Sequence, residues 1–153
     1  MDVLRVLLIN PSMNLQKLGR FAGLLEPMPC IGLAYIAAAL EQHGCHVRVI
    51  DMFAERLDVQ QVVDKAVRFG PDLVGMTVLT PSAPVCSAIS QRMRSRIPEA
   101  KIVWGGVHAD VFGPEIVRSG DQILRSITTV RSQYASWWTL LLQTRKTFHP
   151  LMG

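Results

Sequence analysis

The chain has few cysteines. Cys30, Cys45 and Cys86 are the only three among 153 residues, and they lie too far apart to form a paired zinc-ligand motif. Their spacing also excludes a radical-generating iron–sulfur cluster, which needs three closely spaced cysteines in one chain. An odd number of cysteines gives no complete disulfide framework, so we expect a reducing compartment, the cytoplasm.

The chain also lacks a long apolar run. Its first apolar segment, residues 3–9, ends at Asn10-Pro11 and is too short for a secretory signal. No other segment is long enough to cross a bilayer, so no membrane association is expected. With 49% hydrophobic residues, the chain is long enough for one well-packed domain.

Acidic residues are absent from residues 122–153, which hold four of the sixteen basic residues. Residues 1–121 therefore carry twelve basic and twelve acidic residues, and the formal charge of +4 belongs to the tail. A neutral body has no basic face of the kind that binds nucleic acid. The tail also lacks a regular apolar period, which fits either disorder or translation out of frame beyond Asp121. We therefore separate a domain at 1–121 from an atypical tail.

Strand-like and helix-like segments alternate along the first domain. Short runs rich in β-branched residues predict strands at 3–9, 47–50, 73–78 and 101–104. Apolar residues at helical spacing predict helices at about 32–43, 59–69, 83–96 and 114–119, with Asp58 and Ser82 as N-caps. This order predicts an α/β protein with a doubly wound, flavodoxin-like parallel sheet of strand order 2-1-3-4, and a fifth strand just after Asp121.

The ends of the first and third strands exclude two common ligands of this architecture. Asn10-Pro11-Ser12-Met13 contains none of the glycines of a dinucleotide-binding motif. A phosphoacceptor domain needs acidic residues after the first strand and an aspartate after the third, where this chain has Asn10 and Thr77. Neither a dinucleotide nor a phosphoryl group is therefore expected.

Two later loops carry the strongest functional signal. Residues 75–82 (Gly-Met-Thr-Val-Leu-Thr-Pro-Ser) follow the third strand, and residues 103–108 (Val-Trp-Gly-Gly-Val-His) follow the fourth. Both should lie at the carboxyl edge of the sheet, where open α/β folds bind ligands. One loop supplies hydroxyl groups and the other supplies bare backbone. That combination suits a large, flat, polar-edged cofactor with a side arm threaded between strands.

The order of these motifs resembles a known family. Asn10-Pro11, residues 27–37 (Pro-Met-Pro-Cys-Ile-Gly-Leu-Ala-Tyr-Ile-Ala), residues 75–81 and residues 105–109 (Gly-Gly-Val-His-Ala) occur in sequence. Together they look like the amino-terminal cobalamin-binding domain of cobalamin-dependent radical S-adenosylmethionine (SAM) proteins. The resemblance covers about residues 3–121.

The wider cobalamin-binding fold carries a D-x-H-x-x-G motif whose histidine ligates cobalt from below. Aligned on Gly32, the aspartate position is Pro27 and the histidine position is Pro29. Proline offers no ligand, so the resemblance implies cobalamin bound in a base-off form, without a protein histidine or any other metal ligand from this chain. The S-x-L motif of the fold matches Thr77-Val78-Leu79, a hydroxyl for the nucleotide tail beside two apolar walls, and Gly105-Gly106 matches its paired glycines.

The resemblance implies a set of cofactor-binding residues. They are Asn10, Gly32, Leu33, Thr77, Val78, Leu79, Thr80, Gly105, Gly106, Val107 and His108. The same residue types also have purely structural uses, because threonines close strands and cap helices, paired glycines form tight turns, and a histidine such as His108 suits a surface loop. Both kinds of role stay open at this point.

The implied function is a cobalamin-binding module, the truncated cofactor-binding half of a radical SAM methyltransferase or cyclase. A radical SAM domain in trans is the partner that this implies. Because the cluster-binding cysteines are absent, no catalysis is expected from this chain alone. The alternative is a flavodoxin-like interaction or regulatory domain without cobalamin.

Overall fold

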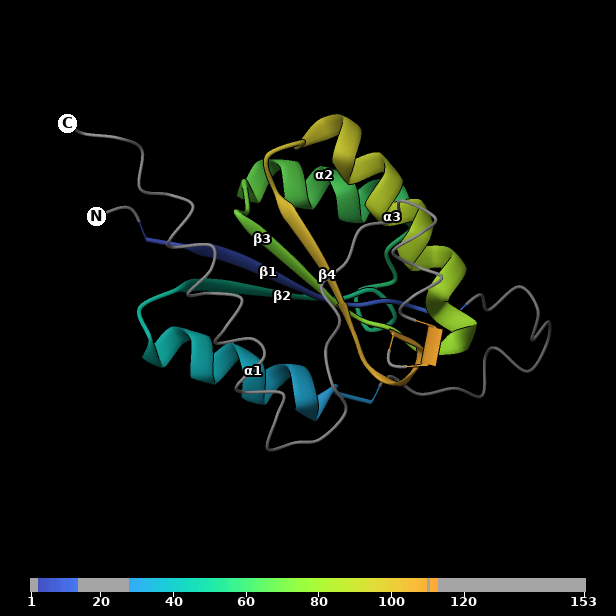
Figure 1. The fold of residues 1–153 in the computed structure, drawn as a ribbon, viewed down its shortest axis with the longest axis horizontal. Coiled ribbons are helices and arrows are strands. Elements are labelled where there is room, and N and C mark those ends of the chain that lie inside the picture. Colours follow the sequence, from blue (N-terminus) through green and yellow to red (C-terminus); the bar gives the residue numbers. More distant parts are fainter. Residues whose placement is uncertain (1–2, 14–27, 110, 113–153) are drawn as a thin grey trace.

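The structure, a computed structural model, describes residues 3–13, 28–109 and 111–112 (Figure 1). Its elements in chain order are β1 (Arg5–Asn10), α1 (Ile31–Gln42), β2 (His46–Asp51), α2 (Val59–Phe69), β3 (Leu73–Thr77), the 3-10 turn η2 (Thr80–Ser82), α3 (Ala83–Arg96) and β4 (Lys101–Gly105). Helical residues begin again at 107, one residue after β4, in a segment predicted as a loop. The predicted helix at 114–119, the fifth strand and the tail at 122–153 lie outside the described residues.

The four described strands form one parallel sheet in the order β2-β1-β3-β4, which confirms the predicted topology. Figure 1 shows α1 on one face of this sheet and α2 with α3 on the other. The chain therefore leaves β1 toward one face and β3 toward the opposite face. Within the described residues, none of the helices is both long and apolar enough for a membrane span.

Local capping explains where α2 begins and ends. The Asp58 carboxylate accepts a hydrogen bond from the Gln61 backbone N–H at 2.8 Å, and the Gln61 side chain accepts one from the Asp58 N–H at 2.9 Å. Gly70 ends the helix in the left-handed region, with φ at 62°. The predicted cap and stop signals of this helix are both confirmed.

Ser82 lies at the N-cap position of α3, but its hydroxyl does not cap the helix as predicted. The hydroxyl turns back to Leu79, accepting its backbone N–H at 3.1 Å and donating to its carbonyl oxygen at 3.0 Å. The reason is that Ser82 already has helical backbone angles within η2, whereas a capping serine is usually extended. Pro84 in the first turn also has no N–H to be capped.

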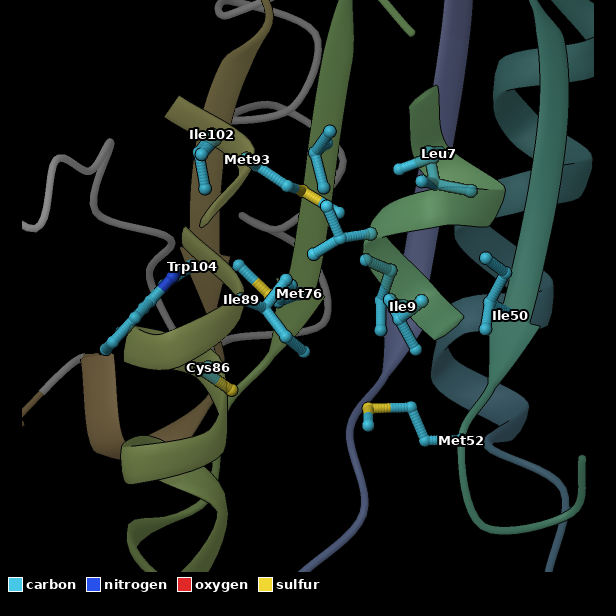
Figure 2. Close-up of a cluster of buried hydrophobic side chains, with 14 of the residues drawn as sticks. Leu7, Ile9, Ile50, Met52, Met76, Cys86, Ile89, Met93, Ile102 and Trp104 are labelled. Atoms are coloured by element: carbon cyan, nitrogen blue, oxygen red, sulfur yellow. The ribbon is translucent and has the colours of Figure 1, made fainter. Parts of the chain in front are cut away.

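The core is split by the sheet into two clusters, because side chains along each strand point alternately to opposite faces. The larger cluster fills the space between the sheet and the pair α2 and α3, and Figure 2 labels side chains of this cluster from all four strands and from α3. The smaller cluster lies beneath α1 and includes Val6, Leu8 and Val103. Trp104 of β4 is buried in the larger cluster, where its indole N–H donates to the Ser90 hydroxyl at 3.0 Å.

Candidate cofactor-binding site

The carboxyl ends of β1 and β3 form the point where the chain changes faces. Ile9 pairs with Met76 in this parallel ladder, so the next residues, Asn10 and Thr77, stand beside each other at the edge of the sheet. Helices that leave adjacent strands toward opposite faces open a crevice between the strand ends. Two of the predicted site residues therefore flank the position at which open α/β folds bind ligands.

The loops after β3 and β4 are joined by three hydrogen bonds. The Val78 N–H donates to the Gly105 carbonyl oxygen at 2.7 Å, and the His108 N–H donates to the Val78 carbonyl oxygen at 3.3 Å. The His108 Nδ1 also lies 3.2 Å from the Thr80 hydroxyl oxygen. Both loops lie at the carboxyl edge of the sheet, as predicted, and the structure adds that they contact each other.

Gly106 shows why this loop needs glycine. Its φ of +100° is one that side chains of L-residues rarely adopt. A Cβ added there would lie 3.0 Å from the Val78 carbonyl oxygen, 3.3 Å from the Val78 nitrogen and 3.6 Å from the Thr77 hydroxyl oxygen. The absent side chain thus lets the backbone approach the end of β3, and a tight turn accounts for this glycine without a ligand.

The two threonines of the β3 loop differ in what their hydroxyls contact. Thr80 is paired with His108, and the His108 ring packs against Phe112 with ring centroids 4.7 Å apart. Thr77 is half-buried, and its hydroxyl has no hydrogen-bond partner among the described residues. Thr77 therefore carries, at the carboxyl end of β3, a hydroxyl with no partner in the described part of the chain.

The apolar members of the predicted set divide between core and surface. Val78 and Leu33 are buried, Val78 in the larger core cluster and Leu33 in the cluster beneath α1. Leu79 and Val107 are 51% and 56% exposed, one on each loop. Leu79 and Val107 therefore supply the accessible apolar surface next to the two joined loops.

Gly32 lies in the first turn of α1, the helix that begins at the carboxyl edge of the sheet. A Cβ added to Gly32 would meet no atom of the described residues within 4 Å, and the φ of Gly32 lies outside the left-handed region. Glycine inside a helix is less stable than alanine by roughly 0.5–1 kcal/mol. Nothing in the described chain therefore requires glycine here, and the described residues leave the space beside it open.

One side-chain contact at this edge was not predicted from the sequence. The Asn10 amide donates to the Asp51 carboxylate at 2.9 Å and ties the end of β1 to the end of β2. The other carboxylate oxygen of Asp51 accepts the backbone N–H groups of Phe53 and Ala54 at 3.0 and 2.9 Å. An aspartate followed by a turn is a recognisable local signal, but its partner Asn10 is 41 positions away.

The described residues offer no metal centre. Within the described ranges, no group of three or more His, Cys, Asp or Glu residues is placed to hold a metal ion. His43 and His46 follow the end of α1 and begin β2, so they lie at the amino edge of the sheet, opposite the loops after β3 and β4. Pro29, at the aligned position of a cobalt-ligating histidine, is exposed just before α1.

Comparison with known proteins gives the family. Residues 21–128 match the family model described as the B12 binding domain, a match that includes the ends of β3 and β4 with their joined loops. The chain belongs to the B12-binding domain family.

Two curated relatives are enzymes. Over 130 residues the chain is 32% identical to cytidylyl-2-hydroxyethylphosphonate methyltransferase of Streptomyces wedmorensis, a match that covers 71% of this chain and 23% of that enzyme. Over 142 residues it is 27% identical to anaerobic magnesium-protoporphyrin IX monomethyl ester cyclase of Rubrivivax gelatinosus, covering 85% of this chain and 25% of the cyclase. The chain thus spans about a quarter of the length of the curated relatives it matches.

Two solved structures share the fold. The cobalamin-dependent SAM radical enzyme OxsB with aqua-cobalamin bound matches with a TM-score of 0.77 at 16% identity, covering 97% of this chain and 20% of OxsB. The response regulator domain of Thermotoga maritima CheB matches with a TM-score of 0.55 at 16% identity, covering 95% of this chain and 96% of that domain. The fold is therefore flavodoxin-like, with a sheet order common to cobalamin-binding and response regulator domains.

Proposed function

We propose that this chain binds cobalamin at the carboxyl edge of its sheet, as the cofactor-binding half of a radical SAM methyltransferase or cyclase. Membership of the B12-binding domain family is the observation that carries the proposal. The residues present also fit such a ligand, because the open position at Gly32 and the unused Thr77 hydroxyl lie at this edge. The enzyme relatives support the catalytic context, although each extends well beyond the matched region.

The proposed contacts to cobalamin lie in two places at the carboxyl edge of the sheet, one for the nucleotide tail and one for the corrin ring. The nucleotide tail would enter the crevice between β1 and β3, where Thr77 donates its hydroxyl and Leu79 and Val107 cover apolar parts of the ligand. The corrin ring would lie over the start of α1, where Gly32 leaves room. The cofactor, when bound, supplies cobalt chemistry that no side chain can provide. The chain's own contribution is binding and orientation.

We also propose that the bound cobalamin is base-off and lacks a histidine below cobalt. Pro29 stands at the ligand position, and proline has no donor for a metal. His43 and His46 lie at the far edge of the sheet. His108, the described histidine at this edge, has its Nδ1 against Thr80. Water or an open position would then face cobalt from below.

The wider setting follows from the same resemblance. A radical SAM domain acting in trans, in the cytoplasm, would supply the cluster that three scattered cysteines cannot hold. Nucleic acid is not a proposed partner, because residues 1–121 carry equal numbers of acidic and basic residues. The chain alone would bind the cofactor without turnover.

The test is a titration of the purified full chain with hydroxocobalamin, followed by gel filtration and an absorbance spectrum of the protein fraction. We expect one cobalamin per chain. After reduction to Co(II), the electron paramagnetic resonance spectrum should lack nitrogen splitting if the cofactor is base-off without histidine. Nitrogen splitting would overturn the base-off proposal alone, whereas elution without cobalamin would overturn the binding itself.

A second candidate function is an interaction or regulatory domain without cobalamin. The response regulator fold of CheB covers almost the same part of this chain as OxsB does. Gly106, moreover, is explained by the chain's own backbone. The same titration decides between the two functions, because this alternative predicts no retained cofactor at any concentration.

A further inference from the structure

The outer side of α1 carries an apolar stripe. Ile31, Ala34, Tyr35 and Ala38 are exposed and recur at the three- and four-residue spacing that places side chains on one side of a helix. Ile31 and Tyr35 are 67% and 63% exposed. The opposite side of α1 is the one that packs on the sheet, through Leu33 and Leu40 among others. We call the four exposed residues the α1 stripe.

The helices on the other face of the sheet do not share this feature. The outer side of α2 is polar, and its Lys65 and Asp64 pair with Glu55 and with Arg96 of α3. In contrast, α1 contains no charged residue from its start at Ile31 to Leu40. A helix that is apolar on both sides is typical of a helix covered on both sides. Something is therefore expected to cover the α1 stripe.

We propose that a second copy of this chain covers it, through antiparallel packing of the two α1 helices about a twofold axis. A twofold interface brings each patch against its own copy, so a patch without charge meets no like charge. The axis would pass near Tyr35, with Ala34 and Ala38 allowing the helices to approach closely. Ile31 of one copy would then pack near Ala38 of the other.

The charges at the ends of α1 favour this arrangement over other coverings. The first turn of α1 has no acidic residue, and its N-cap, Cys30, makes no side-chain capping hydrogen bond. Glu41 is exposed at the other end, ten residues or about 15 Å along the helix axis. Antiparallel packing places Glu41 of each copy near the first turn of its partner, where helix N–H groups favour negative charge. Each copy would supply the acid that the other lacks.

The size of the stripe sets the expected strength. Twelve residues of helix are about 18 Å long, so two such helices bury less surface than stable dimers generally do. The association should be reversible and in the micromolar range. The association is measured without cobalamin, because the partner's Glu41 and the proposed corrin ring would both lie near the first turn of α1.

The test is sedimentation equilibrium of the full chain without cobalamin, from low micromolar to near-millimolar concentration. Wild type should shift from monomer to dimer. Tyr35→Lys should raise the dimer dissociation constant by at least about tenfold, because the twofold axis sets the two new charges against each other. Glu41→Lys should raise it by a smaller factor, since it reverses the charge beside the partner's first turn. Val49→Lys, at an exposed apolar position on β2, is the matched control and should not change it.

Several outcomes would overturn the proposal. A wild-type monomer at every concentration would mean that another protein or the rest of this chain covers the stripe. A dimer that persists in both Tyr35→Lys and Glu41→Lys, or one lost in Val49→Lys, would place the interface elsewhere. Circular dichroism of each variant checks that the fold is retained, and Glu41→Lys keeps the test valid should Tyr35→Lys fail to fold. Cobalamin binding is measured separately, so failure of either proposal is recognised independently.

Discussion

The Val78 N–H donates to the Gly105 carbonyl oxygen at 2.7 Å, one residue beyond the last paired residue of β3. This hydrogen bond continues the ladder between β3 and β4 into the loops that follow them. It places Gly106 against the backbone of Val78 and brings His108 within reach of Thr80. The two loops therefore act as one surface, and substitutions in them should affect folding and binding in separable ways.

Gly106→Ala should destabilise the protein even without a ligand. The new Cβ would lie 3.0 Å from the Val78 carbonyl oxygen at a φ of +100°. Strained backbone positions of this kind cost roughly 1–3 kcal/mol. Urea unfolding of the free protein measures the loss. An unchanged free energy of unfolding would mean that the loop has a different backbone conformation from the one described.

Gly32→Ala should have the opposite effect on folding. The added Cβ meets no described atom within 4 Å, so the free energy of unfolding should rise by roughly 0.5–1 kcal/mol through helix propensity. If the corrin ring lies over this turn, the same methyl group should weaken hydroxocobalamin binding. Gln42→Ala, at the far end of α1, is the control. A higher free energy of unfolding with unchanged affinity for hydroxocobalamin would remove Gly32 from the proposed site.

Thr77→Val should weaken cobalamin binding without unfolding the domain. Valine keeps the shape of the side chain and removes a hydroxyl that has no partner among the described residues. One lost hydrogen bond to a ligand is worth about 1 kcal/mol, or about a fivefold increase in the dissociation constant. Cobinamide, which lacks the nucleotide tail, is the matched control ligand, and its affinity should be the same for both proteins. Equal weakening for cobinamide would argue that Thr77 does not contact the tail.

Cys86 should resist thiol reagents in the folded protein. Burial raises the pKa of its thiol from 9.0 to about 12, against a smaller opposing effect of its hydrogen bond with Ser82. The thiolate is the reactive form, so Ellman's reagent at pH 8 should label the half-buried Cys30 and Cys45 first. Cys86 should react only after unfolding. Mass spectrometry of labelled peptides identifies the order.

The same pKa shift gives an alkaline dependence of stability. The folded thiol keeps its proton between pH 9 and about 12, whereas the unfolded thiol loses it. The contribution of the Cys86 thiol to the free energy of unfolding is therefore fully present below pH 9, and it is lost as the pH rises toward the pKa of the folded thiol. Cys86→Ala should unfold more easily at neutral pH and should lose this part of the pH dependence. A slope above pH 9 equal to that of wild type would assign the effect to other groups.

Local patterns in the sequence were sufficient for the four strands, for α1, α2 and α3, and for the place of the two loops at the carboxyl edge of the sheet. Strands such as Leu73–Thr77 read as apolar β-formers, and the carboxyl ends of parallel strands necessarily share one edge. The Asp58 cap and the Gly70 stop are also local, since each acts within one helical turn. The caps and the element types depend on neighbours in the chain, and the strand order follows from the handedness rule for parallel connections, which is why these features were predictable from the sequence.

Contacts between distant segments were decided only by the tertiary structure. The sequence indicated that residue 106 needs a small side chain. It could not show that the atom packed closest to this position is the Val78 carbonyl oxygen rather than a ligand. It could not pair Asn10 with Asp51, nor separate the buried Leu33 from the open Gly32 beside it. Each depends on how strands and helices pack against one another, because residue type sets what a side chain can bind and the fold sets what lies within its reach.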